Sequence, residues 1–308
     1  MKRLIYSLLA LSASILALSS CQDVIDLKTE AGPTQLVVDG WITDQGATQR
    51  IKLSLSAGYF DNSAVKPALG AKVTVSSGSA VYEFKDLKND GNYVWSATNG
   101  KSFAKVGETY KLNIQYGGDT YEAQSAMKRV PPIDSIAYEY KERTAVPDDA
   151  PKSGYLAEFY ANDPVGPGDC YWIKHYKNGK LYNKADEITI AYDGAFSVGS
   201  ASDGFMFILP IRQAITSRNT LDLYAEKDTL KVELYSISLE AFYFLFQVQQ
   251  ESTNQGLFAT APSNIPTNVI NTNPTGKKAL GFFGVSAVST LQTVIDAKKA
   301  RPTKSGFR

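Results

Sequence analysis

The sequence predicts a mainly β protein, in which an N-terminal immunoglobulin-like or prealbumin-like sandwich precedes a second antiparallel β-rich domain with one buried helix. Three observations lead to this fold class. The 308 residues include 18 tyrosines and 14 phenylalanines, and aromatic and β-branched residues favour strands. Apolar and polar residues alternate in short runs, as they do in half-buried strands. Glycine, asparagine and aspartate separate these runs, as they do at turns.

Residues 34–128 contain the expected sandwich. Its apolar or alternating runs cover 36–42, 51–55, 73–75, 81–84, 93–97, 110–116 and 121–123. Turn residues lie between several of them, at 89–92, 99–100 and 117–119. About seven short strands at this spacing are typical of an immunoglobulin-like sandwich.

Residues 129–297 form the second expected domain. We place the boundary at Pro131 and Pro132, because consecutive prolines cannot donate hydrogen bonds to a sheet. A loop within one larger domain is the alternative. Strands are expected at 135–141, 155–160, 171–177, 180–182, 205–210, 220–225, 230–235 and 279–287, with loops at 163–169 and 261–276. Asn178 and Gly179 predict a two-residue hairpin turn.

One stretch, near 238–250, predicts a helix. Ser238 is a capping residue, Glu240 lies in the first turn, and the stretch contains neither glycine nor proline. Its first ten positions are apolar on nearly all sides, so we expect the helix to be enclosed in a core. A strand is the alternative, because aromatic residues also favour strands.

Residues 1–20 have the layout of a lipoprotein signal peptide. Lys2 and Arg3 precede an apolar run that ends in Leu18-Ser19-Ser20-Cys21. We expect cleavage between Ser20 and Cys21 and acylation of Cys21 with diacylglycerol and palmitate, which would anchor the protein to a membrane. A spanning helix is one alternative, but the run is short and broken by serines. A plain signal peptide with an incidental cysteine is the other.

Two short segments flank the expected domains. Residues 21–33 are polar and form a tether, and residues 298–308 form a basic tail that we expect to be solvated and disordered. Gln22 follows the anchoring cysteine where an inner-membrane retention signal would have aspartate. We therefore expect an outer-membrane location.

Charge and cysteine content exclude some classes of protein. The chain has 32 basic and 31 acidic residues, and only Lys2 and Arg3 lie in the signal peptide. No basic field is left for binding nucleic acid, so we expect no nucleic-acid partner. With Cys21 acylated, Cys170 has no second cysteine, so the fold depends on its core and not on a disulfide.

The sequence predicts no catalytic residue, metal site or cofactor. His175 is the single histidine and is expected to be structural. Cys170 and His175 are five residues apart on one expected strand and would lie on opposite faces, so we reject them as a catalytic pair. One histidine and one cysteine cannot supply a zinc site. Phosphate and dinucleotide loops are absent from the sequence.

Three further features have alternative interpretations. Residues 86–91 carry oxygen ligands near a glycine, but they fit a turn better than a calcium loop. Trp41, Trp95 and Trp172 could stack on sugars, although aromatic residues in strands more often belong to a core. Two carboxylates that meet only in the folded chain would leave no sequence motif, so a hydrolase stays open.

Several motifs occur in order along the chain. They are Gly-Trp-Ile-Thr-Asp at 40–44, Gly-Ala-Lys-Val-Thr-Val at 70–75, Val-Gly-Glu-Thr-Tyr-Lys-Leu at 106–112, Pro-Pro-Ile-Asp-Ser-Ile at 131–136, Pro-Ser-Asn-Ile at 262–265 and Ala-Leu-Gly-Phe-Phe at 279–283. Together they resemble the Bacteroidota cell-envelope lipoproteins labelled domain of unknown function 4249. The resemblance implies a lipoprotein that is often encoded beside TonB-dependent outer-membrane receptors, and it implies no catalytic residues.

The resemblance leaves the face of the membrane open. Lipoproteins exported to the surface in this lineage usually carry a lysine and two acidic residues just after the cysteine, whereas this chain has Gln22-Asp23-Val24. We expect a non-enzymatic binding or accessory module that is anchored through Cys21, with a TonB-dependent receptor as a possible partner and an undefined small ligand. A structural envelope protein without a ligand and a carboxylate-dependent hydrolase are the alternatives.

Overall fold

The structure is a computed structural model that describes residues 32–302 except 59–60, 62, 99, 101, 144–150, 183, 200, 217–222, 255–259 and 261–262. Strands dominate it, which confirms the predicted fold class. The signal peptide, Cys21 and most of the tether lie outside the described residues, so their predicted roles stay predictions.

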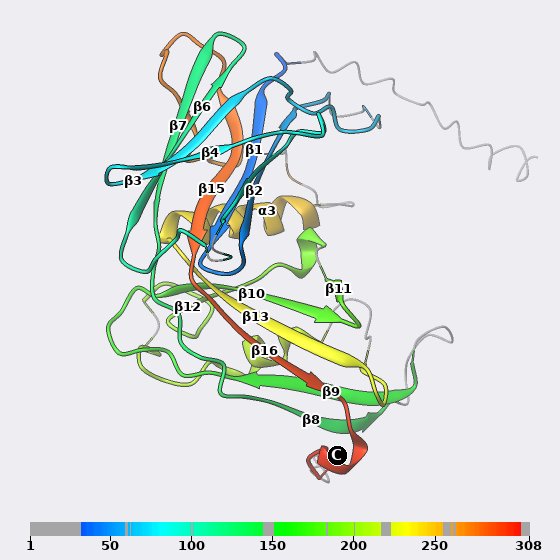
Figure 1. Cartoon of the computed structure of the whole chain (residues 1–308). Coiled ribbons are helices and arrows are strands. Elements are labelled where there is room, and N and C mark those ends of the chain that lie inside the picture. Colours follow the sequence, from blue (N-terminus) through cyan, green and yellow to red (C-terminus); the bar gives the residue numbers. More distant parts are fainter. Residues whose placement is uncertain are drawn as a thin grey trace, which may run out of the picture. The chain divides into compact units, whose positions relative to one another are not determined.

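The first part of the fold is a sandwich of two sheets (Figure 1). One sheet has the order β15-β1-β2-β5, formed by Ala279–Ser286, Leu36–Thr43, Thr48–Leu55 and Asn92–Ser96. The other has the order β14-β7-β6-β3-β4, formed by Ile270–Asn271, Asp119–Ala126, Thr109–Tyr116, Lys72–Ser77 and Ala80–Phe84. Alternate residues of each strand, such as Ile51, Leu53, Val73 and Val75, are fully buried between the sheets. The period of two in the sequence therefore corresponds to one buried face.

Strand β15 joins the sandwich although it lies more than 150 residues beyond the other strands of both sheets apart from β14. It pairs in parallel with β1, from Leu36 opposite Ala279 to Thr43 opposite Ser286. Residues 279–287 were expected in the C-terminal domain, whereas hydrogen bonding places this strand in the N-terminal sandwich. Pairing over such a distance leaves no local signal. The domain boundaries themselves stay a prediction.

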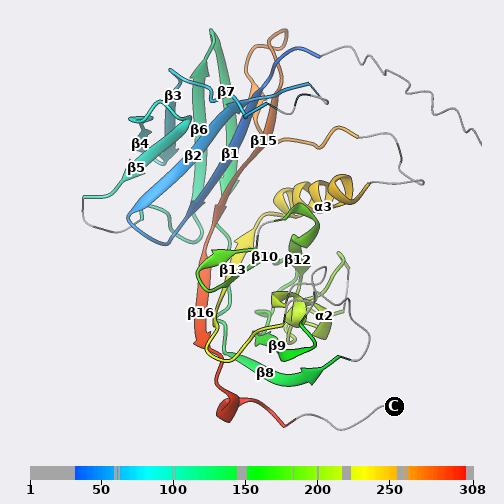
Figure 2. The same ribbon diagram turned by 90° about the vertical axis from the view of Figure 1, so that its right-hand side faces the viewer.

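The second part contains a sheet of order β11-β10-β13-β16, with β12 also paired to β10. These strands are Lys180–Leu181, Cys170–Lys177, Thr229–Ile237, Val288–Val294 and Thr189–Tyr192. A separate hairpin pairs β8, Ser135–Glu142, with β9, Ser153–Tyr160. Only Ala287 separates β15 from β16, so one extended segment contributes to both parts. Figure 2 shows this segment running from the sandwich into the second sheet.

The predicted hairpin at Asn178 and Gly179 is confirmed. Both residues have positive φ, +52° and +77°, and they connect Lys177 of β10 to Lys180 of β11. This backbone geometry matches the right-handed twist of the flanking strands.

Some expected strands differ in the structure. The expectation at 205–210 is wrong, because a short helix, α2, covers Leu209–Arg212 and continues into the 3₁₀ turn η2, Gln213–Ile215. Proline suits the first turn of a helix, where its missing N–H costs nothing, and Pro210 occupies that position. Of the strand expected at 220–225, residues 220–222 are not described and Tyr224 makes only an isolated bridge with Tyr155. Strands β12 and β16 were not expected, and the short strand β14 lies within the stretch 261–276 that was expected to be a loop.

The start of the expected basic tail has regular structure. Ala297–Lys299 forms a 3₁₀ turn, η3, and the N–H of Arg301 donates to the carbonyl oxygen of Tyr138 in β8. The expectation of disorder is therefore wrong for these residues, because backbone hydrogen bonds hold them against the hairpin. Residues 303–308 lie outside the described part of the chain.

Helix α3, Leu239–Thr253, confirms the predicted helix and its cap, since the Ser238 hydroxyl accepts the N–H of Ala241 at 3.1 Å. Ala241, Phe242 and Leu245 are buried, but Tyr243 and Phe246 are 45% and 43% exposed. The expectation that its first ten positions are all enclosed is therefore wrong. One side of the helix is therefore buried and another is partly exposed. Figure 1 shows the helix between the strands of the sandwich and β10. No helix within the described ranges is long and apolar enough to cross a bilayer.

Candidate functional site

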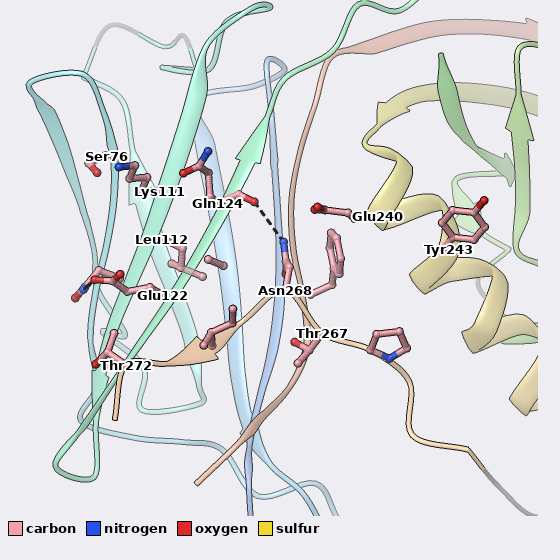
Figure 3. A pocket seen from close by; sticks show the side chains of 15 residues that line it. Ser76, Lys111, Leu112, Glu122, Gln124, Glu240, Tyr243, Thr267, Asn268 and Thr272 are labelled. Atoms are coloured by element: carbon pink, nitrogen blue, oxygen red, sulfur yellow. Dashed lines mark hydrogen bonds between the residues drawn. The ribbon is translucent and has the colours of Figure 1, made fainter. Parts of the chain in front are cut away.

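A groove of about 1000 Å³ separates helix α3 from the outward face of the sheet β14-β7-β6-β3-β4. We call it the helix groove and define it by Lys111, Glu122, Gln124, Glu240, Tyr243 and Asn268. Figure 3 shows strand side chains along one wall and Glu240 and Tyr243 of α3 along the other. The groove is at the upper end of the size range of small-molecule sites.

Polar side chains on one wall of the groove follow from strand geometry. Lys111 on β6, and Glu122 and Gln124 on β7, are the exposed positions that alternate with core residues. Asn113 donates to Glu122 at 3.1 Å, which orients that carboxylate. The wall therefore offers an ammonium, a carboxylate and amides that can form hydrogen bonds with a ligand.

Asn268 connects the two sheets at the floor of the groove. Its side-chain amide exchanges two hydrogen bonds with the backbone of Phe283 in β15, at 2.8 and 2.9 Å. Its Nδ2 also donates to the carbonyl oxygen of Gln124 in β7 at 3.5 Å (Figure 3). Asn268 thus acts as a one-residue bridge between strands, and the segment that carries it borders the groove.

A second cavity of about 490 Å³ also borders α3. We call it the Lys174 cavity and define it by Trp41, Trp172, Lys174, Phe244 and Phe282. The rings of Trp41 and Trp172 are 5.0 Å apart between centroids, and those of Phe244 and Phe282 are 4.9 Å apart. Trp41, Trp95 and Trp172 all pack against hydrophobic clusters, as predicted, but Trp41 and Trp172 line this cavity as well.

Lys174 is held by aromatic rings. Its Nζ lies 3.6 Å from the centroid of Trp172 and 4.1 Å from that of Tyr235, which sits opposite Trp172 on β13. No carboxylate of the described chain forms a salt bridge with it. Burial lowers the pKa of Lys174 to about 8, and the charges of Glu233 and Asp39 offset part of this decrease.

Glu233, directly opposite Lys174 in the sheet, is engaged by other groups. Its carboxylate accepts Lys231 Nζ at 2.8 Å, the Tyr176 hydroxyl at 2.8 Å and the Tyr235 hydroxyl at 2.9 Å. Burial by itself raises the pKa of Glu233. The hydrogen bonds from Lys231 and the two tyrosines together lower it by more than burial raises it, so the pKa is lowered overall. The carboxylate nearest to Lys174 in the sheet is thus already satisfied.

Replacing Lys174 with methionine is expected to raise the free energy of unfolding at neutral pH by about 1 to 2 kcal/mol, because it removes a partly buried ammonium. The Lys174 pKa is about 8 in the folded state against an ordinary 10.5. The buried ammonium therefore destabilises the folded state fully below pH 8. This destabilisation disappears as the pH rises past 10.5, where the lysine becomes neutral in both states. Urea denaturation should show that the variant's extra free energy of unfolding decreases as the pH rises from 8 to 10.5. A constant gain would contradict the lowered pKa.

Three carboxylates converge in the second part of the fold. One oxygen each from Asp163, Asp193 and Asp203 lies within 4.8 Å of the others, and in the described ranges this is the group that could hold a metal ion. Asp163 accepts the Tyr171 hydroxyl at 2.6 Å, and Asp203 accepts the Gly166 N–H at 2.9 Å. Burial raises the pKa of Asp163. The carboxylates organise these loops whether or not a cation binds.

This cluster was not expected from the sequence, because its members come from two separate loops, the one between β9 and β10 and the one between β12 and α2. A usable signal was the Asp193-Gly194 pair, which is a hairpin turn sequence with positive φ at both residues. The predicted turn at 86–91 is confirmed, since the Asp86 carboxylate accepts the N–H groups of Asp90 and Gly91.

Cys170 and His175, which were rejected above as a catalytic pair, are both buried. His175 is 5% exposed and stacks on Tyr182 with ring centroids 4.6 Å apart. Cys170 is 1% exposed, and burial raises the pKa of its thiol to about 12. A thiol with this pKa contains almost no thiolate at neutral pH and is a poor nucleophile. Cys21, the predicted lipidation site, lies outside the described residues.

The fold and its cavities define a β-sandwich protein in which β15, from late in the chain, returns to the first sheet and in which helix α3 borders both a polar groove and an aromatic cavity. The chain matches the model of the family described as "Domain of unknown function (DUF4249)" over residues 22–292, and it therefore belongs to that family. The resemblance noted from the sequence motifs is confirmed at this level. A search of curated proteins found no match to the chain.

Proposed function

We propose that this protein is a lipid-anchored outer-membrane lipoprotein that acts as a non-enzymatic binding module, accessory to a TonB-dependent nutrient uptake system. The helix groove is the observation that supports the binding role most directly. The motif Leu18-Ser19-Ser20-Cys21 supports the anchor. The uptake partner rests on what the family resemblance implies.

The chemistry of the helix groove favours an extended polar ligand such as a glycan or a peptide. Charges of both signs and amide groups line its strand wall, and the exposed ring of Tyr243 lies on its helix wall. Polar groups that converge beside an aromatic ring are typical of recognition sites. A polar ligand could therefore hydrogen-bond to the strands while it stacks on Tyr243.

A ligand screen with two matched helix variants tests this site. We expect thermal shifts with a subset of a glycan and peptide panel, and we expect Tyr243→Ser to weaken binding of the hits by about tenfold, since a stacked ring contributes on the order of 1 kcal/mol or more. Phe246→Ser is the control, because Phe246 is equally exposed on α3 but does not line the groove. Equal losses in both variants, or no hit at all, would favour a structural protein without a ligand.

The anchor and the partner are tested in cells of the source lineage. The wild-type chain should incorporate labelled palmitate and fractionate with outer membranes, and Cys21→Ala should lose both properties. Affinity purification from solubilised outer membranes should recover a TonB-dependent receptor. An unlabelled wild-type chain would contradict the anchor, and a preparation without a receptor would contradict the accessory role.

A further inference from the structure

The Lys174 cavity is separate from the helix groove. Glu240 and Tyr243 of α3 line the groove, whereas Phe244 and Leu245 line the cavity, so different residues on neighbouring sides of the helix border the two sites. Only Phe282 borders both. A ligand in the cavity would therefore be independent of the groove and of the membrane anchor.

Lys174 has no salt-bridge partner among the described residues, although Asp39 and Glu187 also line the cavity. Lys174 and Lys231 lie on the neighbouring strands β10 and β13, and Glu233 is the carboxylate between them. Lys231 Nζ donates a hydrogen bond to the Glu233 carboxylate at 2.8 Å, and two tyrosine hydroxyls also donate to this carboxylate. Lys174 is left with the faces of two aromatic rings, which attract a cation but do not neutralise it.

The rest of the cavity is largely apolar. Trp41, Phe244 and Phe282 pack with one another on one side, and the ring of Trp172 lies between Trp41 and Lys174. A partly buried ammonium in such surroundings interacts strongly with an opposite charge, because little water screens it. Flat aromatic walls provide contact area for an apolar group next to that charge.

We propose that the Lys174 cavity binds an organic monocarboxylate with an apolar body. The Lys174 ammonium pairs with the carboxylate, and the rings of Trp41, Trp172 and Phe282 contact the apolar part. Asp39 and Glu187 also line the cavity, and their charges disfavour a second acidic group on the ligand. The volume of about 490 Å³ limits the ligand to a small molecule.

The Lys174 pKa of about 8 supports this assignment, because the ammonium form still predominates at neutral pH. Burial lowers that pKa, and an incoming carboxylate would raise it again by placing a negative charge next to the ammonium. Ligand binding thereby offsets the destabilisation that the buried Lys174 ammonium causes in the unliganded protein.

Titration of the purified protein with defined probes tests the proposal. The probes are 4-phenylbutyrate and octanoate, which separate an aromatic from an aliphatic body, and their neutral amides. Binding is followed by calorimetry and by the fluorescence of Trp41 and Trp172. At least one carboxylate should bind about tenfold or more tightly than its amide, because a charged hydrogen bond contributes about 1.5 to 3 kcal/mol. Equal affinity for acid and amide, or no binding of either acid at millimolar concentration, would overturn the proposal.

Lysine variants locate the site. Lys174→Met should weaken carboxylate binding by about tenfold or more, and Lys174→Arg should retain most of it, because it keeps the positive charge. Lys184→Met is the matched control, since Lys184 lines the same cavity but is exposed. A larger loss in Lys184→Met than in Lys174→Met would overturn the assignment. Tyr243→Ser should leave this binding unchanged, so failure here is distinguishable from failure of the groove proposal.

Discussion

Gly281→Ala is expected to lower the free energy of unfolding by more than about 4 kcal/mol or to prevent folding, because it combines backbone strain with a backbone clash. Gly281 lies within β15 with φ of +88°, a region that alanine rarely adopts. A Cβ at this position would overlap the carbonyl oxygen of Val38 in β1. Backbone cannot rotate away as a flexible side chain can, so β15 would have to move from its partner.

Gly70→Ala is the matched control for this variant. Gly70 has φ of +75°, similar to that of Gly281, but a Cβ there would meet no atom within 4 Å. Gly70→Ala should lower the free energy of unfolding by only about 1 kcal/mol, because it introduces backbone strain without a clash. Chemical denaturation of both variants gives the comparison. Similar losses would contradict the close approach of β15 to β1 and, with it, the position of Phe282 between the two cavities.

Asp193→Ala is expected to lower the free energy of unfolding by about 2 to 4 kcal/mol, because it removes two hydrogen bonds that a charged carboxylate accepts from backbone N–H groups. Asp193 is 2% exposed, and its Oδ1 accepts the N–H groups of Gly168 and Asp169, each at 2.8 Å. Its φ of +44° adds strain for alanine. Removing this one carboxylate should therefore loosen the contact between the two loops that meet at the acidic cluster.

Asp193→Asn separates the hydrogen bonds from the charge. Asparagine keeps an acceptor oxygen and tolerates positive φ, so it should cost less than about 1 kcal/mol. Denaturation in the presence of a chelator prevents a bound cation from contributing to either value. A loss with asparagine as large as that with alanine would show that the negative charge, and not the acceptor, is what the loops require.

Local features of the fold could be predicted because their causes are local. The alternation of Ile51, Leu53, Val73 and Val75 marks strands with one buried face, and the structure buries all four. Asn178 and Gly179 marked a hairpin, since few residues accept its positive φ. Ser238 marked the start of α3 through a hydrogen bond to a residue only three positions away.

The candidate sites were less predictable because they form between distant segments. The helix groove requires β6, β7 and α3 together, and Lys174 meets Tyr235 only because β10 pairs with β13. The all-round apolar sequence of α3 indicated full enclosure, but one side is partly exposed, and Tyr243 remains available at the groove. A hydropathy pattern records which residues are apolar and not how many neighbours cover them.

The sequence by itself determined the mainly β class, the hairpin turns, the helix and its cap, and the family; the anchor at Cys21 is a proposal that rests on the sequence. The tertiary structure alone decided that β15 pairs with β1, that α3 borders two cavities, and that Lys174 lies against aromatic rings while Lys231 forms a salt bridge with Glu233. The physical reason is the range of the interactions. Turns, caps and alternation depend on residues within a few positions, whereas strand partners and the balance of buried charges depend on which distant segments come into contact.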